Sequence, residues 1–397
     1  MADRSVLLSS NYNAWPEVFN GQCFAFLNVV DGVEDAQMLV PPGAPYTAGR
    51  AVRPNFRYLF GELLHRSHSQ LRRKFGQPAA SNMQEVTVDR DHDLFMFMCQ
   101  FPVELAAINR LKGWRERSRT AVAFILESWS HTHEAAKSEL ALLNQFDHVF
   151  VLNRECIPNL RKYVTVPISF LATATDCLMA SPFPGNPDRS IDVFSMGRRS
   201  AVIHDKLVAL SGQGDNGFMY VHDTSKGGTI TNWYEHRLMS ANMIKRSKYF
   251  IAFNHTVIDP SSESKNFQEQ ALATRYFEGA AGGSIVLGSR AGCREFDECF
   301  DWDDAVIDLP EDVADLGAFL ADLDGQTDRI ARARIAGVAN CLRRHDWGHR
   351  WGQILDTLGL ERPLALQDRL EMLASLADMA ERSIEGGALA RGQRAAG

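Results

Sequence analysis

The chain has 397 residues, of which 45% are hydrophobic and 23% are charged, which is typical of a globular protein of about two domains. The net charge of −7 argues against a nucleic-acid-binding protein, a class that is more often basic. No apolar run approaches the roughly 20 residues that cross a bilayer, and the N-terminus lacks the pattern of a signal peptide. The seven cysteines show no CxxC spacing, so we expect a cytoplasmic protein without disulfides or a zinc site.

Short apolar runs alternate with helical patterns in the first half of the chain, which is typical of βαβ units and a parallel sheet. The expected strands are Ser5–Ser10, Ala36–Val40, Asp93–Cys99, Thr120–Leu126 and His148–Leu152, with a further short strand in Val164–Leu171. The expected helices between them are Asn55–Lys74 and His133–Gln145. We assign residues 1–180 to an N-terminal Rossmann-like domain.

The stretch Ser181–Pro187 predicts a linker, because its three prolines and a glycine disfavour both a helix and a central strand. The alternation then restarts, with expected strands at Ile191–Met196, Phe218–His222, Tyr249–Phe253, Ser284–Leu287 and Ala305–Leu309. The expected helices are His204–Leu210, His236–Arg246, Phe267–Ala281, Asp312–Leu323, Asp328–Leu358 and Leu364–Ile384. We assign residues 188–362 to a second Rossmann-like domain, 363–385 to a last helix and 386–397 to a flexible tail. Ligands of such sheets bind beyond the carboxyl ends of the strands, so we expect the active site between the two halves.

The motif with the most chemical content spans residues 274–287, where a helix ends at glycines and leads into a buried strand. Gly282 or Gly283 suits the end of the helix, and Arg275 and Glu278 share one helix face. One interpretation is an ion pair beside a packed helix. The other is that Glu278 accepts hydrogen bonds from ribose hydroxyls while Arg275 holds it in place or meets a phosphate.

A second motif follows the strand expected at Ile191–Met196, where Gly197, Arg198 and Arg199 precede a helix that carries His204. Such a turn offers backbone N–H groups and a helix N-terminus to a phosphate. The forked donors of two arginines suit a diphosphate. A solvated arginine pair is the alternative interpretation.

Two other polar stretches lie in the second half of the chain. The loop after the strand Tyr249–Phe253 offers Asn254, His255 and Lys265 as candidate ligand contacts, although a plain connecting loop has the same composition. His345 and His349 have the spacing of metal ligands on a helix, but the HExxH glutamate and a third ligand are missing. We therefore interpret this stretch as aromatic packing.

The first half offers fewer candidates. Glu127 and His131, with His133 nearby, follow an expected strand and are either cleft-facing polar groups and a general base, or residues of a helix start. The loop Ser9–Trp15 is a candidate acceptor-side loop. The stretch Arg110–Arg119 carries five basic residues, which either touch anionic lipid head groups or form a solvated surface.

These residues resemble bacterial GT-B glycosyltransferases of the family 1 and family 4 type, in particular the C-terminal half of the spore-coat-associated group. The likeness rests on Phe194–Arg199, Glu235–Arg237, Arg275–Gly282 and His345–Trp351, and covers about Ser190 to Gly359. It implies an α/β fold of two facing Rossmann-like domains with a last helix that crosses back to the first. It also implies sugar transfer from a nucleotide donor without a bound metal or other cofactor.

The resemblance also implies roles for single residues. In related retaining enzymes a pair of glutamates flanks the sugar donor; Glu278 matches the second, which faces the ribose, and Gln270 stands at the position of the first. Arg198, Arg199 and Lys265 would stabilise the leaving diphosphate, and Gly282 is a further expected contact of the donor. The departing phosphate would deprotonate the acceptor in a retaining enzyme, whereas an inverting enzyme would need a base such as Glu127 or His131.

We therefore predict a metal-independent, retaining glycosyltransferase whose acceptor is a cell-envelope saccharide, a lipid or a small molecule. A sugar-nucleotide epimerase on the same fold and a non-catalytic sugar- or nucleotide-binding protein are the alternatives. The expected partners are a nucleotide-sugar donor and a glycan, lipid-linked or small-molecule acceptor, without nucleic acid. Weak peripheral contact with the inner face of a membrane stays open.

Overall fold

The computed structural model describes residues 4–43, 67–72, 75–197, 199–213, 217–224, 229–253, 255–258 and 268–395. The chain forms two compact units, each with its own parallel sheet. The first unit contains Met1–Ala172, Ser225–Trp233 and Thr256–Glu269, and the second contains Thr173–Thr224, Tyr234–His255 and Gln270–Gly397. The stretch Ser181–Pro187 belongs to the second unit.

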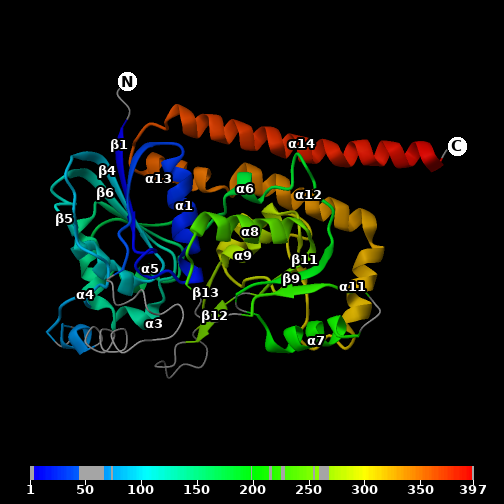
Figure 1. Cartoon of the computed structure of the whole chain (residues 1–397), viewed down its shortest axis with the longest axis horizontal. Helices are drawn as coiled ribbons and strands as arrows, with labels where there is room; N and C mark the ends of the chain where they lie inside the picture. The colour runs from blue at the N-terminus through cyan, green and yellow to red at the C-terminus, as the bar shows by residue number, and fades with distance from the viewer. Residues whose placement is uncertain are drawn as a thin grey trace. The chain divides into compact units, whose positions relative to one another are not determined.

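The first unit is built on a sheet of six parallel strands in the order β2-β1-β4-β6-β7-β8 (Figure 1). The strands are β1 (Ser5–Ser10), β2 (Asp35–Leu39), β4 (His92–Cys99), β6 (Ser118–Ile125), β7 (His148–Val151) and β8 (Ile168–Phe170). Strands β1, β4 and β6 are buried along most of their length, as expected of a parallel sheet that is covered on both faces. The strands predicted for the first half are confirmed, with small shifts at their ends.

Short helices and a small two-stranded sheet complete the first unit. They are η1 (Val18–Asn20), α1 (Gly21–Asp31), η3 (Pro102–Arg110), α3 (Ser130–His133), α4 (Lys137–Leu140), η4 (Ala141–Gln145), α5 (Ile157–Leu160), β3 (Val86–Thr87) and β5 (Leu111–Lys112). The single helix predicted over His133–Gln145 is instead interrupted after His133, and the chain continues as α4 and then as the 3-10 helix η4. Most of the helix predicted at Asn55–Lys74 lies outside the described residues.

The second unit contains five parallel strands in the order β10-β9-β11-β14-β15. They are β9 (Ile191–Ser195), β10 (Tyr220–His222), β11 (Ser247–Ala252), β14 (Ile285–Gly288) and β15 (Ile307–Asp308). Each corresponds to a predicted strand. Apolar side chains of β9, β11 and β14 pack with those of α7, α11 and α12 into one buried cluster. The helices are α6 (Cys177–Ala180), α7 (Ala201–Ser211), α8 (Trp233–Lys245), α9 (Thr274–Ala281), α10 (Arg294–Cys299), α11 (Leu316–Gly325), α12 (Thr327–Arg344), α13 (Trp347–Thr357) and α14 (Leu364–Ala395).

Two helix predictions for the second half are wrong in part. The residues expected to begin the helix Phe267–Ala281 form the strand β13 (Gln268–Ala271), which pairs with β12 (His255–Ile258), and α9 begins only at Thr274. Pairing with β12 therefore overrides the helix propensity of glutamine and glutamate. The helix expected over Asp328–Leu358 is split into α12 and α13, because Asp346 takes an extended conformation and its side chain accepts the N–H of Gly348 as the cap of a new helix.

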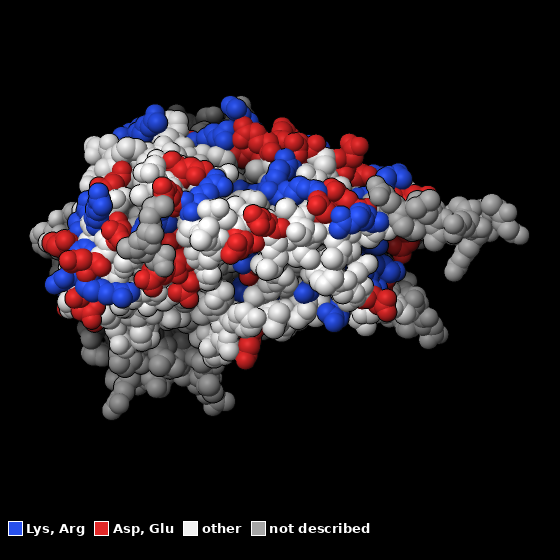
Figure 2. Space-filling model, turned by 90° about the horizontal axis from the view of Figure 1, so that it is seen from above, with Lys and Arg blue, Asp and Glu red and all other residues white. Residues whose placement is uncertain are grey.

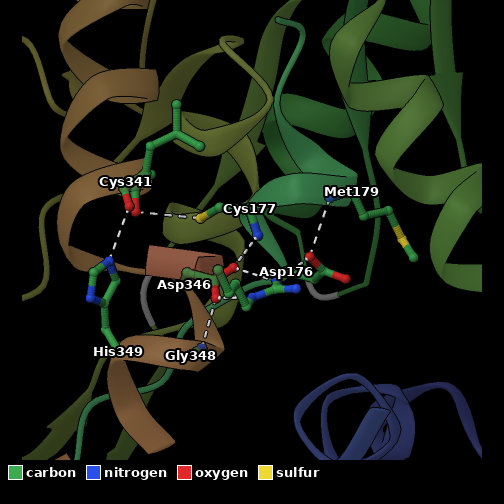
Figure 3. A network of polar contacts seen from close by, with 9 residues as sticks. Asp176, Cys177, Met179, Cys341, Asp346, Gly348 and His349 are labelled. Carbon is green, nitrogen blue, oxygen red and sulfur yellow. Dashed lines mark hydrogen bonds and ion pairs between the residues drawn. The ribbon is translucent and has the colours of Figure 1, made fainter. Parts of the chain in front are cut away.

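A buried network of charged groups holds the ends of several helices of the second unit (Figure 3). Asp346 is fully buried and accepts hydrogen bonds from the backbone N–H groups of Cys177, at 2.8 Å, and Gly348, at 2.7 Å. Arg369 of α14 donates to the carboxylates of Asp346 and Asp176 at 2.7–2.9 Å. The network thereby fixes the starts of α6 and α13 against the N-terminal part of α14.

Helices α12 and α14 lie side by side (Figure 1), and Arg343 joins them through ion pairs with Asp378 and Glu381. Leu366 and Leu373 of α14, seven residues apart on one helix face, are buried. On the face drawn in Figure 2, basic and acidic side chains lie next to one another rather than in two separate fields. Within the described residues, none of the helices combines the length and hydrophobicity that crossing a membrane requires.

Candidate active site

In the second unit, the turn that follows β9 depends on a glycine. Gly197 has a φ of +68°, a left-handed conformation that glycine adopts without strain, and a side chain there would meet no other atom within 4 Å. The backbone conformation therefore explains this glycine. Its N–H donates to the carboxylate of Asp223 at 3.2 Å, so the turn that was predicted to offer N–H groups to a phosphate is closed by a carboxylate here.

Arg199 lies at the same turn. Its guanidinium donates to the backbone carbonyl of Asp223 at 2.7 Å and lies 3.0 Å from the carboxylate of that residue. Ser200 caps α7, accepting the N–H of Ile203. The turn thus places an arginine beside a capped helix N-terminus. Arg198, the other arginine predicted to act here, lies outside the described residues.

Two histidines and a tyrosine lie next to Arg199. The Nδ1 atom of His204 is 2.9 Å from the hydroxyl of Tyr220, and the rings of His204 and His222 meet edge to face with centroids 4.8 Å apart. Partial burial, together with the positive Arg199 and the neighbouring His222, lowers the pKa of His204. The structure therefore brings together Gly197, Arg199 and His204, as the second motif predicted.

Arg275 connects this turn to α9. Its guanidinium donates to the backbone carbonyls of Met196, at 3.4 Å, and Phe253, at 3.1 Å. Met196 directly follows the end of β9, and Phe253 directly follows the end of β11. Arg275 is 9% exposed, so it acts as a buried brace at the carboxyl edge of the sheet.

Glu278 forms an ion pair that the sequence did not reveal. Its partner is Arg237 of α8, whose Nη2 lies 2.6 Å from Oε1 of Glu278, and both side chains are largely buried. Helices α8 and α9 lie close together in Figure 1, as this pair requires. The stretch Glu235–Arg237 carried part of the family resemblance, and this was the signal that could have singled out Arg237.

The glycines at the end of α9 have different explanations. Gly283 has a φ of +66°, which suits the predicted helix end. Gly282 was predicted to bind the sugar donor, but its lack of a side chain is explained by packing, since a Cβ atom there would lie 2.4 Å from Ile244 of α8. Gly282 thus allows α9 and α8 to approach each other.

Several predicted contacts cannot be placed. Asn254 and Lys265 lie outside the described residues, and His255 is described only as part of the backbone of β12. Gln270 lies in β13 rather than in a helix, and its Oε1 accepts the backbone N–H of Gly292 at 2.5 Å.

In the first unit, polar residues follow β4 and β6 at the carboxyl edge of the sheet. The side-chain amide of Gln100 donates to Oε1 of Glu127 at 2.9 Å, and the backbone N–H of Glu127 donates to the carbonyl of Gln100 at 2.6 Å. The indole N–H of Trp129 lies 3.4 Å from Oε2 of Glu127. Glu127 is therefore held in place at the edge where parallel sheets bind ligands.

The sequence did not single out Glu104, the second carboxyl group of this edge. Its side chain is 4% exposed and accepts the backbone N–H of Gln100 at 3.2 Å. Burial raises the pKa of Glu104 to about 8. No sequence pattern marks this residue, because its proton affinity follows from the surrounding protein.

The predicted base His131 and its neighbour His133 differ in their surroundings. His133 is buried, with Nε2 2.8 Å from the hydroxyl of Ser128 and Nδ1 3.1 Å from the amide of Asn159, and burial lowers its pKa to about 4. His133 is therefore a structural residue. His131 is half-buried and lies in the short helix α3, whose first N–H, that of Ser130, donates to Glu269 at 2.7 Å.

The two remaining motifs are explained by structure. In the basic stretch, Arg110 and Lys112 pair with Glu85, Arg115 with Asp147 and Arg117 with Asp91, which makes a solvated, neutralised surface. His345 and His349 each contact a backbone carbonyl, and Trp347 and Trp351 are fully buried, so packing explains this stretch as we inferred. Among the described residues, no three His, Cys, Asp or Glu side chains are grouped as a metal ion would require.

Comparison with known proteins places this architecture. Residues 212–356 match the family model described as Glycosyl transferase-like, whereas the sequence matches no curated protein. An alpha-glucosyltransferase solved with UDP and a 13-mer DNA containing an HMU base is 10% identical, with a TM-score of 0.51, over 90% of this chain and 100% of that chain. A trehalose-6-phosphate synthase gives 10% identity and a TM-score of 0.47 over 90% and 99% of the two chains. The structure of TarM is 11% identical, with a TM-score of 0.42, over 66% of this chain and 54% of that chain.

At about 10% identity a similar structure is evidence for the fold alone. Of the three structures, the first has a TM-score high enough to support a shared fold. Its fold, the two parallel sheets and the matched family model agree with the resemblance inferred from the sequence. The chain therefore has the fold of GT-B glycosyltransferases, and its residues 212–356 are similar to a glycosyltransferase-like family.

Proposed function

We propose that this protein is a glycosyltransferase that takes its sugar from a nucleotide-sugar donor, which binds at the carboxyl edge of the second unit's sheet. The observation that carries the proposal is the brace made by Arg275. It ties α9, the helix of Glu278, to the carbonyl of Met196, next to Gly197 and Arg199. A cationic turn and a buried carboxylate thus belong to one rigid frame, as the two ends of a nucleoside diphosphate require.

In this proposal the diphosphate binds the turn after β9 and replaces the carboxylate of Asp223 at the N–H of Gly197 and at Arg199. Arg199 and the N-terminus of α7 supply positive potential to the leaving group, whose negative charge grows as the bond to the sugar breaks. Arg198 and Lys265 are proposed to add to this charge. Glu278, oriented by Arg237, is proposed to accept the ribose hydroxyls.

We further propose that transfer needs no metal and retains the anomeric configuration. The bond from the anomeric carbon to the diphosphate oxygen breaks, the acceptor oxygen bonds to that carbon on the same face, and the acceptor proton passes to the departing phosphate. If transfer inverts instead, Glu127, held by Gln100, is the better placed base, with His131 as the second candidate. The anomeric configuration of the product, read by NMR, decides between the two.

The donor is identified by a thermal-shift panel of UDP, GDP, ADP, dTDP and their sugars. A ligand that binds only the folded protein adds about 2.7 kcal/mol of apparent stability at a hundred times its dissociation constant. The variant Glu278→Ala should weaken binding of the active nucleotide roughly 10–100-fold, the range expected for lost hydrogen bonds to a charged group. Glu139→Ala, which also removes a fully buried carboxylate, serves as the control. Equal donor affinity in the two folded variants would refute the role of Glu278.

A further inference from the structure

Three aromatic side chains of the first unit form a partly exposed row. The rings of Trp15 and Phe19 meet edge to face with centroids 5.3 Å apart, and those of Phe19 and Phe101 with centroids 5.4 Å apart. All three are half-buried, unlike the fully buried phenylalanines of the core, and Val18 beside them is 53% exposed. We call Trp15, Phe19 and Phe101 the aromatic row. Its rings lie at the surface, where they can contact a ligand.

The loop that carries Trp15 and Phe19 is held rigidly. The N–H of Trp15 donates to the carbonyl of Asn11 at 2.9 Å, and the carbonyl of Trp15 accepts the amide of Asn20 at 2.8 Å. Glu17 forms an isolated antiparallel β-bridge with Thr229. A preformed surface loses little conformational entropy when a ligand binds, so this loop is suited to recognition.

One end of the aromatic row leads directly to hydrogen-bonding groups. Phe101 follows Gln100, whose amide donates to Glu127 at 2.9 Å, and the carbonyl of Phe101 accepts the N–H of Glu104 at 3.0 Å. An apolar surface of rings set edge to face therefore ends at an amide and a carboxylate that lie at the carboxyl edge of the sheet. Binding sites for small molecules commonly combine aromatic walls with a few polar groups that fix orientation.

This combination fits a carbohydrate better than the other acceptor classes. A pyranose has an apolar face of C–H groups, which packs on an aromatic ring, and a rim of hydroxyls that donate to carboxylates. A lipid chain would gain nothing from the carboxylate at the end of the row. A nucleic acid would be repelled by Glu17 and Glu127 and by the net charge of −7.

We infer that the aromatic row is the acceptor subsite of this enzyme and that the acceptor is an uncharged saccharide of two or more rings. The inference rests on the proposed function. One sugar ring packs on Phe101 with a hydroxyl at Glu127, and the next ring packs on the face of Phe19 or of Trp15, which are perpendicular to each other. The row thereby sets specificity for the acceptor, while Glu127 orients the hydroxyl that reacts.

The test is binding of maltotriose, cellotriose and chitotriose to the full chain, measured by tryptophan fluorescence and saturation-transfer NMR. At least one trisaccharide should bind, and Phe19→Ala should weaken its binding about tenfold, which corresponds to about 1.4 kcal/mol. Phe19→Leu keeps an apolar side chain without the ring and should show most of the same loss, which separates stacking from folding. The control is Phe75→Ala, which removes a phenylalanine that is 73% exposed in the same unit.

Several results would overturn the inference. These are the absence of binding by all three trisaccharides, an equal effect of Phe19→Ala and Phe75→Ala, or binding of a 13-mer DNA duplex or of neutral phospholipid vesicles that Phe19→Ala abolishes. The nucleotide thermal-shift panel is run on the same variants. If nucleotides raise the melting temperature but no saccharide binds, only the acceptor subsite is refuted. If no nucleotide raises the melting temperature of the unmodified chain, the proposed function is refuted.

Discussion

Glu278 and Asp346 of the second unit and Glu104 of the first unit are buried carboxyl groups that are stabilised in different ways. In the second unit, Glu278 and Asp346 each meet an arginine, Arg237 and Arg369. In the first unit, Glu104 is held mainly by backbone and amide groups, and burial raises its pKa to about 8. A paired carboxylate stays ionised and depends on its partner, whereas an unpaired one takes up a proton and depends on pH. The difference predicts that the second unit is sensitive to loss of an arginine and the first to a rise in pH from about 5 to about 8.

The largest effect is expected from Arg369→Met. The change leaves Asp346 and Asp176 without their cation in the interior, which should cost about 3–5 kcal/mol of unfolding free energy. The measurement is urea unfolding followed by circular dichroism. Arg343→Met is the matched control, because Arg343 also pairs with acidic groups of α14 but is 37% exposed, and it should cost less than about 1 kcal/mol. Equal losses of unfolding free energy in the two variants would show that the buried carboxylates of the second unit do not depend on their arginine.

A smaller loss is expected from Arg237→Met. Glu278 would keep its buried charge without this partner, which should cost about 2–3 kcal/mol, less than at Arg369 because Arg369 pairs with two carboxylates. Adding Glu278→Leu removes the stranded charge and should restore much of the stability. Urea unfolding of the single and double variants measures the coupling. If the two losses simply add, the ion pair does not hold α8 to α9.

The third prediction concerns pH. Because the pKa of Glu104 is about 8 in the folded chain and near 4.5 when unfolded, the folded state binds the extra proton in between. The stability that this proton contributes is therefore fully present below about pH 4.5 and is lost as the pH rises through about 8. The free energy of unfolding falls by at most about 1.4 kcal/mol per pH unit in this range. We expect a loss of about 1 kcal/mol between about pH 6 and pH 7 that Glu104→Gln removes. Unfolding curves of both proteins across this range give the slopes, and parallel slopes would exclude Glu104 as the cause.

The smallest effect is expected from Arg117→Ala. Arg117 and Asp91 form an ion pair whose side chains are 44% and 84% exposed, so the variant should change the unfolding free energy by less than about 0.5 kcal/mol. The same urea experiment, repeated at high salt, provides the measurement. A loss comparable to that of Arg237→Met would show that exposure does not decide the strength of these pairs.

Much of the candidate site was predictable where the signal is local. Gly197 and Gly283 stand where the backbone turns left-handed, and Arg199 and His204 lie at the strand-to-helix turn that the second motif indicated. The partner of Glu278 was not predictable, because Arg237 lies on another helix and is brought near only by the packing of α8 on α9. The same packing explains why residue 282 is a glycine.

The sequence alone determined where most strands and helices lie along the chain. Short apolar runs and apolar residues at helical spacing are buried in the same way in any parallel α/β protein. It also indicated the family through short motifs. Tertiary structure decided that Gln268–Ala271 pairs as β13, that Arg275 braces two strand ends, and that Glu104 holds a proton. Each of these depends on groups distant in the chain, whose desolvation and hydrogen bonds exist only once the units have folded.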